Sequence, residues 1–376
     1  MASLRERFRA WLHRRIADPD WQRWAAAFPL TRPLAQKRTR ALFDLCAGFV
    51  YSQTLYACVQ VDLFERLRGG PRTVSELAPA LGLSGAAALR LFRAAASLQL
   101  LEALPNDRWA LADLGAAMLG NPAIGDFVAH HALLYDDLRD PVALLRGEVE
   151  TSLAQFWPYA ERRPDAPQRV ADEKRRQAYE GYCALMSRSQ ALIADDVLDA
   201  WPTHRHRCWL DVGGGEGAFV AAAAARTTVT RFQLFELPEV AARAQAAMVA
   251  QGLTERVDVF AGDFLADSLP KGADIVSLVR VLHDHDDESA LALLSRIRDA
   301  LPQGGTLLIA EPMAQTRGAE PVGDAYFGLY LLAMGRGRAR SAREIAALAG
   351  RSGFVDCQLL KMLRPLLASA LMARRV

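Results

Sequence analysis

Two histidines and four acidic residues lie together in the stretch "RVLHDHDDES", residues 280–289. This stretch follows the apolar run "ADIVSLV", a pattern typical of a buried strand. Histidine accepts protons near neutral pH, and histidine with carboxylates can also bind a metal ion. A third interpretation involves no chemistry, because Asp286 or Asp287 would cap a helix expected over 288–301.

The two histidines differ in their position relative to the expected strand. His283 comes just after its apolar residues, where catalytic groups of open α/β sheets gather, so a catalytic role is favoured for His283. His285 is expected at the entrance of the following helix. A metal site would need both rings and a carboxylate, but the helix start competes for the acids and no further cluster supplies ligands. We therefore predict no metal.

A second group of candidate residues lies in "LDVGGGEGAFV", residues 210–220. Gly213 and Gly215 fall at a turn from a strand into an Ala-rich helix, where missing side chains let backbone amides approach a ligand. About 20 residues further on, an acidic residue at the end of the next strand would accept hydrogen bonds from a ribose. Glu236, in "FELPEV", is that residue.

The next expected strand ends in "AGDF". Asp263 could accept a hydrogen bond from an adenine amino group, and Phe264 could cover a face of the ring. Asp211, Glu236 and Asp263 would make the rim of this pocket negative. A negative rim suits a cationic sulfonium cofactor better than a pyrophosphate.

Short β-type runs alternate with Ala-rich helical segments over residues 200–376, which predicts an α/β domain with a parallel sheet. Its last two runs, 354–363 and 366–376, are separated by a short turn and are expected to form an antiparallel hairpin at one edge. Residues 121–199 have helical periodicity and are interpreted as linking helices.

Residues 41–120 have the order helix, turn, helix and small hairpin, which is typical of a winged helix. Such a domain could read DNA, but its second helix offers mainly Ala and Leu besides Arg90 and Arg93. An apolar packing face is therefore favoured. The net charge of the chain is only +2, which gives no reason to expect a nucleic-acid partner.

Residues 1–40 carry ten Arg or Lys against three acids, together with aromatic side chains. This basic arm could be a helical extension packed on the body, or it could lie in a membrane interface. It lacks the apolar core of a secretory signal, and no uninterrupted apolar run reaches the length of a transmembrane helix. Five widely spaced cysteines fit a reducing cytoplasm.

The motifs "LDVGGGEG", "FELP", "GDF", "RVLHDHDD", "IAEP" and "REIAALAGRSGF" occur in an order that resembles one family. This family comprises the S-adenosylmethionine-dependent O-methyltransferases with a winged-helix dimerisation domain. The resemblance implies a Rossmann-like domain with a seven-stranded sheet, S-adenosylmethionine as cofactor and a homodimer. The arginine-rich leader and "YACVQVDLFERLRGGPRTVSELAPALGL" resemble most the hydroxyneurosporene (demethylspheroidene) O-methyltransferases of bacterial carotenoid synthesis.

The resemblance also implies roles for individual residues. His283 corresponds to the general base, Glu311 in "IAEP" to a carboxylate that orients its ring, and Arg280 to a residue near the cofactor. Plant members have a second glutamate beside the histidine, whereas the corresponding residue here is Ala339. The second carboxylate is therefore missing or supplied by another residue, and the base is expected to be held less tightly than in relatives that methylate phenols.

These expectations describe a cytoplasmic homodimer that methylates a hydroxyl of an acyclic carotenoid, with its arm able to contact the inner membrane. Two alternatives remain open. A phenolic or polyketide hydroxyl could be the acceptor, or the chain could be a winged-helix regulator that binds S-adenosylmethionine without catalysis. A regulator would be expected to lack a base, which His283 and Glu311 would provide.

Overall fold

The computed structural model describes residues 3–120, 122–156, 186–190 and 193–376. Its residues form two compact units, Met1–Gly120 and Asn121–Val376. The segment expected to link two domains, 121–199, thus belongs to the second unit wherever the structure describes it.

Three helices begin the first unit, namely α1 (Leu4–Ala17), α2 (Pro19–Ala27) and α3 (Arg32–Gln60). Side chains cap the first two, because Ser3 forms a capping box with Glu6, and Asp18 accepts hydrogen bonds from the first turn of α2. The third helix continues unbroken past residue 40. The expected end of the basic arm therefore falls inside α3, where the residue pattern gives no stop signal.

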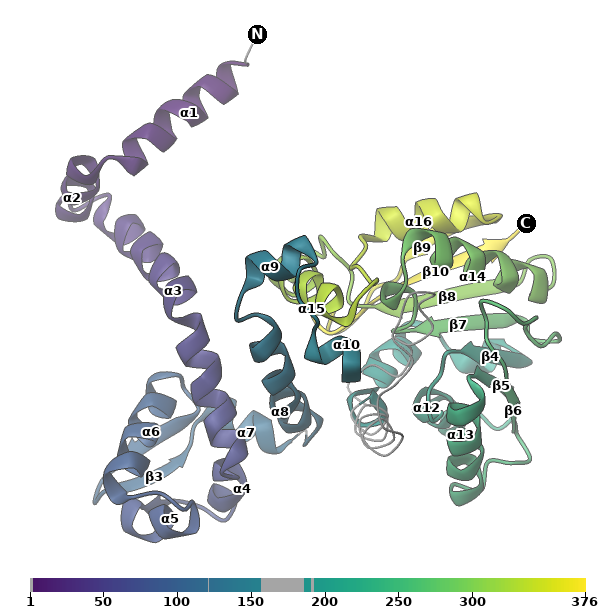
Figure 1. Cartoon of the computed structure of the whole chain (residues 1–376), viewed down its shortest axis with the longest axis horizontal. Coiled ribbons are helices and arrows are strands. Elements are labelled where there is room, and N and C mark those ends of the chain that lie inside the picture. Colours follow the sequence, from purple (N-terminus) through teal and green to yellow (C-terminus); the bar gives the residue numbers. More distant parts are fainter. Residues whose placement is uncertain (1–2, 121, 157–185, 191–192) are drawn as a thin grey trace. The chain divides into compact units, whose positions relative to one another are not determined.

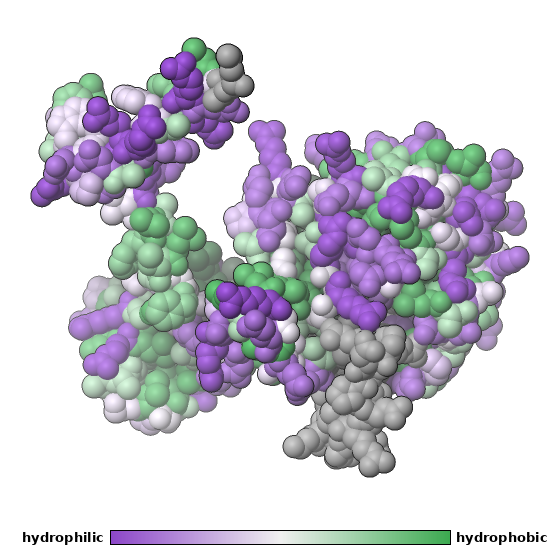
Figure 2. Space-filling view, turned by 45° about the horizontal axis from the view of Figure 1, so that its top comes forward, coloured by the Kyte–Doolittle hydropathy of each residue, from purple (hydrophilic) through white to green (hydrophobic). Residues whose placement is uncertain are grey.

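Helix α3 is longer and more apolar than the sequence analysis implied. Its 29 residues could cross a membrane by length and composition alone, and it is the one such helix in the described ranges. Asp44 and several polar residues interrupt its apolar stretch, so the helix contains no unbroken apolar run of that length. Core helices of soluble proteins can have the same length and composition, but Phe43, Leu45 and Phe49 are exposed here. Hydrophobic residues gather on this part of the unit in Figure 2.

The rest of the first unit contains short helices around a small sheet. The elements are α4 (Leu63–Leu67), β1 (Arg72–Thr73), α5 (Val74–Ala80), α6 (Gly85–Ser97), β2 (Leu101–Leu104), β3 (Arg108–Leu111) and α7 (Asp113–Leu119). The three strands are antiparallel in the order β1-β3-β2. Helix α6 buries Ala88, Phe92 and Ala95 in the core of this unit, so its apolar face is a packing face, as expected.

The second unit begins with helices and continues into a seven-stranded sheet. Its first helices are α8 (Pro122–Asp137), α9 (Pro141–Arg146) and α10 (Ser152–Phe156), followed by helical residues 186–190 and 193–200. The strands are β4 (Cys208–Val212), β5 (Arg231–Glu236), β6 (Val257–Ala261), β7 (Ile275–Val279), β8 (Thr306–Glu311), β9 (Phe354–Leu359) and β10 (Ser369–Arg375).

The strand order is β6-β5-β4-β7-β8-β10-β9, and only β10 pairs antiparallel to its neighbours β8 and β9. This arrangement confirms the predicted parallel sheet and its antiparallel edge hairpin. The chain leaves β4 toward β5 and β6, and later returns on the other side of β4 to add β7 and β8. Ligands of open α/β sheets bind where the strand order reverses in this way, here at the carboxyl ends of β4 and β7.

Helices cover both faces of this sheet (Figure 1). They are α12 (Ala218–Ala225), α13 (Pro238–Ala250), α14 (Asp287–Ala300) and α16 (Ala342–Arg351), whereas α15 (Phe327–Met334) packs against α8, α9 and α10. One core layer joins α14 and α16 to the sheet, and a second joins α12, α13 and residues 193–201 to its other face. Since central strands such as β7 and β8 are buried along their whole length, the ends of the strands are where polar side chains can reach solvent or a ligand.

Candidate active site

The glycine turn connects β4 to α12. Gly213, Gly215 and Gly217 have φ angles of 70°, 59° and 85°, a region that disfavours other residues. Gly214 passes so close to Asp211 that an added Cβ would lie 2.4 Å from Oδ2 of that carboxyl group. The turn therefore needs glycine both for its backbone conformation and for its contact with the strand below it.

A pocket lies beside this turn at the carboxyl ends of β4, β5 and β7. Five residues predicted to bind the cofactor line it, namely Gly213, Gly215, Glu236, Phe264 and Arg280. The other lining residues are Met186, Ser187, Gln190, Gly214, Glu216, Ala218, Val279, Val281, Asp284 and His285. A bare backbone turn flanked by carboxylates and one phenyl ring fits an adenosine group that carries a cationic sulfonium.

Two further residues expected to bind the cofactor do not line this pocket. Asp211 is buried beneath the glycine turn, where its Oδ1 accepts a hydrogen bond from the hydroxyl of Ser277. Asp263 accepts a hydrogen bond of 2.9 Å from the backbone N–H of Leu265. Sequence spacing placed both residues at the ends of strands, but it could not give the directions of their side chains.

A second pocket adjoins the first and contains His283. Its walls are mostly apolar and aromatic, formed by Phe127, Met186, Arg280, His283, Asp284, Phe327, Tyr330, Leu331 and Met334. Phe327, Tyr330 and Met334 of this wall lie on α15, and the side chains of residues 156–185 are outside the described part of the chain.

Two histidine–tyrosine pairs lie at or behind Tyr330, which lines this second pocket. Nε2 of His130 lies 2.9 Å from the hydroxyl of Tyr330, and Nε2 of His131 lies 2.8 Å from that of Tyr326. Tyr326 and Tyr330 stack on each other with ring centroids 5.8 Å apart. These pairs satisfy the polar groups of the tyrosines, so the aromatic rings can present an apolar surface to a ligand.

His283 and Glu311 are brought together, but not as expected. The Oε2 atom of Glu311 accepts a hydrogen bond of 3.0 Å from the backbone N–H of His283, rather than from its ring. Nδ1 of the ring and Oε1 of Glu311 are both buried and have no hydrogen-bond partner among the described residues. Nε2 of His283 instead lies 3.4 Å from Oδ1 of Asp284. Glu311 thus holds the main chain that carries the ring.

Burial dominates the protonation of these groups. It lowers the pKa of His283 to about 3, and the positive charge of Arg280 acts in the same direction. Burial raises the pKa of Asp284 to about 8 and that of Glu311 to about 7, although arginine charges oppose both shifts. The imidazole is therefore neutral at pH 7, whereas the two carboxyl groups titrate close to neutrality.

Asp286 and Asp287 begin α14, as the capping interpretation predicted. The side chain of Asp286 accepts a hydrogen bond of 2.8 Å from the N–H of Ser289. Asp287 instead binds two arginines from a later segment, Arg338 and Arg340. Within the described ranges, no group of three or more His, Cys, Asp or Glu side chains is arranged to hold a metal ion.

Three residues belong to both pockets, and the sequence analysis assigned a role to only one of them. Arg280 was predicted, whereas Met186 and Asp284 were missed. Arg280 has a φ of 60°, and its guanidinium group donates a hydrogen bond of 2.7 Å to Ser189. The sequence could have indicated a site role for Asp284, because it directly follows His283 in "HDHDD". Helix capping explained the same acidic run equally well.

Comparison with known proteins identifies the family. Residues 135–355, more than half of the chain, match the O-methyltransferase domain, and residues 43–121 match the O-methyltransferase dimerisation domain. The chain belongs to the S-adenosylmethionine-dependent O-methyltransferases. The methyltransferase domain contains both pockets except for Phe127, and its cofactor is S-adenosylmethionine. The dimerisation domain supports a homodimer, and membership of an enzyme family disfavours the regulator alternative.

Curated relatives cover nearly the whole methyltransferase. Demethylspheroidene O-methyltransferase of Cereibacter sphaeroides is 41% identical over 93% of this chain and 91% of the relative. The protein of the same name from Rhodobacter capsulatus is 38% identical over 92% of this chain and 85% of the relative. Among solved structures, mitomycin 7-O-methyltransferase has a TM-score of 0.73 at 25% identity, covering 92% of this chain and 100% of that one.

Proposed function

We propose that this methyltransferase transfers a methyl group to a hydroxyl of an acyclic hydroxylated carotenoid, as in the spheroidene pathway. The two relatives named demethylspheroidene O-methyltransferase, at 41% and 38% identity, support this acceptor. The apolar and aromatic walls of the pocket around His283 suit a hydrocarbon chain that brings a single hydroxyl group.

The observation that carries the mechanism is the meeting of the two pockets at Met186, Arg280 and Asp284, next to His283. S-adenosylmethionine supplies the electrophilic methyl group. With the cofactor bound, the acceptor oxygen would attack that methyl carbon and displace the sulfur as a neutral thioether, and His283 would take the hydroxyl proton on Nε2. Holding both reactants at one junction converts a bimolecular displacement into an intramolecular one.

Nearby charges decide how easily His283 can take that proton. Its surroundings favour the neutral ring, which leaves Nε2 able to accept. An ionised Asp284, 3.4 Å from Nε2, would stabilise the imidazolium that forms. Glu311 holds the backbone of His283 in place. In this proposal Glu236, Phe264 and the glycine turn bind the adenosine, and Asp211 supports the turn from below.

Labelled methyl transfer to a panel of acceptors tests this proposal. Hydroxylated acyclic carotenoids should accept label, whereas His283→Gln should lower turnover by roughly a hundred to ten thousand times with little change in cofactor affinity. A relative that acts on a naphthoate hydroxyl is 29% identical, so phenols and polyketides belong in the panel. If phenols are labelled and carotenoids are not, the proposed acceptor is wrong. If His283→Gln has normal turnover, His283 is not the base.

The proposed location is the cytoplasm, with weak attachment of the arm to anionic membranes. In α1 and α2 the side chains of Phe8, Trp11, Trp24 and Phe28 are exposed among the arginines. Exposed aromatic rings beside cationic groups favour the interface of an anionic bilayer, from which a carotenoid would also be delivered.

Flotation with anionic and neutral vesicles tests this attachment. Because α3 starts at Arg32, the truncation should remove residues 1–31 and leave that helix intact. Full-length protein should float with anionic vesicles more than the truncated protein, and salt should weaken the difference. Equal flotation of the two proteins would assign the arm to protein packing instead.

A further inference from the structure

Arg340 is a charged residue without solvent exposure. It follows α15 in the segment "GRGRAR" and has 0% relative exposure, which places it among the largest fully buried side chains described. Its Nη1 donates a hydrogen bond of 2.9 Å to the carbonyl of Leu282, and its Nη2 donates one of 2.7 Å to the carbonyl of His285. These two carbonyls flank His283, which lines the second pocket, and Asp284, which lines both pockets.

Further hydrogen bonds to main-chain atoms hold the same loop, from β8 and from the segment that contains Arg340. Glu311, at the end of β8, accepts from the backbone N–H of His283. The backbone N–H of Arg338 donates a hydrogen bond of 2.9 Å to the carbonyl of His283. Gly337 lies so near that an added Cβ would be 2.4 Å from this carbonyl oxygen. The loop over 282–285 is thus fixed at several main-chain atoms between β8 and the segment 337–340.

The charge of Arg340 is balanced by one carboxylate at the edge of the loop. Nε of Arg340 donates a hydrogen bond of 2.9 Å to Oδ1 of Asp287, whose side chain is about half exposed. A buried cation is costly unless it is paired, and the planar guanidinium can bind one carboxylate and two carbonyls at the same time. Lysine has a single ammonium group and cannot reproduce this planar arrangement of donors.

From these contacts we infer that Arg340 is a positioning residue for the reaction, since it fixes the loop that carries His283 and Asp284 between the two pockets. It touches neither pocket itself. The neighbouring Ala339 carries no carboxylate that could hold the base from this segment, so Arg340 acts on the main chain instead. This role rests on the proposed function of His283. A displacement of about 1 Å at reacting groups can cost roughly 100-fold in rate.

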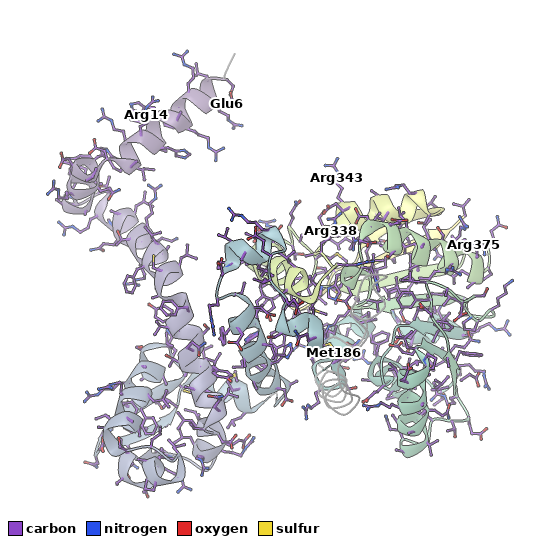
Figure 3. The ribbon with its side chains drawn as sticks, in the orientation of Figure 1. Glu6, Arg14, Met186, Arg338, Arg343 and Arg375 are labelled. Carbon is purple, nitrogen blue, oxygen red and sulfur yellow. The ribbon has the colours of Figure 1, made fainter. Side chains whose placement is uncertain are left out.

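Substitutions at position 340 test this role. Arg340→Met is expected to lower kcat per folded molecule by roughly 10- to 100-fold and to weaken cofactor binding, because Asp284 and His285 line the cofactor pocket. Arg340→Lys keeps the charge but loses the planar contacts, so its kcat should stay several-fold below the wild type. Arg343→Met is the matched control, since Arg343 is exposed and points away from the body in Figure 3.

The readouts are kcat and KM for the acceptor, calorimetric cofactor affinity and the folded fraction from circular dichroism. A residue with only a structural role would lower the melting temperature while leaving kcat per folded molecule unchanged. Wild-type kcat in Arg340→Met or Arg340→Lys would overturn the inference. So would an equal loss in Arg343→Met.

A second variant covers the case in which Arg340→Met does not fold. Asp287→Asn keeps the shape of the partner and removes the charge that balances Arg340, so a several-fold lower kcat is expected in a folded protein. If it retains wild-type kcat, the positioning role fails. His283→Gln measured in parallel separates the two ideas, because normal turnover in that variant would remove the proposed base whatever Arg340 does.

Discussion

At the scale of single residues, the buried carboxyl groups determine how the site depends on pH. The pKa of His283 is lowered to about 3, so the ring stays neutral over the whole working range. The pKa values of Glu311 and Asp284 are raised to about 7 and about 8, so both groups gain charge as the pH rises through neutrality. An ionised carboxylate near the ring favours proton uptake by the imidazole.

We expect kcat/KM to rise with pH around 7 to 8 and to level off above that range. The rising limb belongs to the carboxyl groups, because protonation of the imidazole would occur only at far lower pH. In Glu311→Gln the plateau should fall, and the remaining limb should follow Asp284 at a pH below its wild-type pKa of about 8, because the charge of Glu311 contributes to raising that pKa. Initial rates between pH 5 and 10 measure this. A limb near 6.5 that persists without either carboxyl group would assign it to His283.

For His285 the sequence-based prediction was incomplete, because the residue precedes the N-cap of α14 as expected but also has a further contact. It was expected only at the entrance of a helix, but it lines the cofactor pocket with its ring edge-on to Phe264, at 5.3 Å between centroids and 88°. The pattern of residue types gives the position of such a ring along the chain, but it does not show which pocket the side chain faces. His285→Ala is therefore expected to weaken cofactor binding by roughly three- to tenfold.

Isothermal calorimetry with S-adenosylmethionine measures that loss for His285→Ala. His204→Ala is a suitable control, because His204 is an exposed histidine in the short turn before β4. Unchanged cofactor affinity in both variants would return His285 to a purely structural role.

At the scale of elements, the sheet could be predicted from the sequence. The long-range hydrogen bonds that hold its loops could not. Strand-like runs alternating with helical segments require parallel strands with crossovers, so β4 to β8 followed from the residue pattern. The two closing apolar runs predicted the edge hairpin in the same way, although β9 ends at Leu359 and β10 begins at Ser369, so the connection is longer than expected. The contacts of Arg340 with Leu282 and His285 join segments far apart in the chain, and local patterns contain no information about such pairs.

The glycine turn gives a prediction for one of these elements. Gly214→Ala would place a Cβ 2.4 Å from Oδ2 of Asp211, which is buried and held by Ser277. Relief of this overlap should lower the free energy of unfolding by about 1 to 3 kcal/mol and weaken cofactor binding. Urea unfolding and calorimetry test both effects. Gly350→Ala, in α16 with open space around it, should be neutral or slightly stabilising.

At the scale of the whole molecule, the dimerisation domain leaves much apolar surface uncovered in a single chain. On α3 the side chains of Leu42, Phe43, Leu45 and Phe49 are between 62% and 81% exposed. A contiguous apolar face of this kind is normally covered in a soluble protein, and a two-fold pairing is the commonest arrangement that does so. Its location in the region that matches the dimerisation domain makes a second copy the expected cover.

A charge within this face should therefore separate the two copies. Phe49→Asp is expected to shift the sedimentation behaviour from dimer to monomer, because an unpaired carboxylate would be buried in the interface. Val249→Asp provides the matched control, since Val249 is 60% exposed on α13 in the methyltransferase domain. A stable dimer in Phe49→Asp would place the interface on another surface.

The wall that Met186, Arg280 and Asp284 contribute to both pockets also makes cofactor and acceptor binding thermodynamically linked. If bound cofactor shifts these side chains toward the geometry that the acceptor prefers, the acceptor must strengthen cofactor binding by the same factor. The dissociation constant of the cofactor should be measured with and without the acceptor, and that of the acceptor with and without the cofactor. The two ratios should be equal. That common ratio, and not either affinity alone, measures the free energy of coupling between the two ligands.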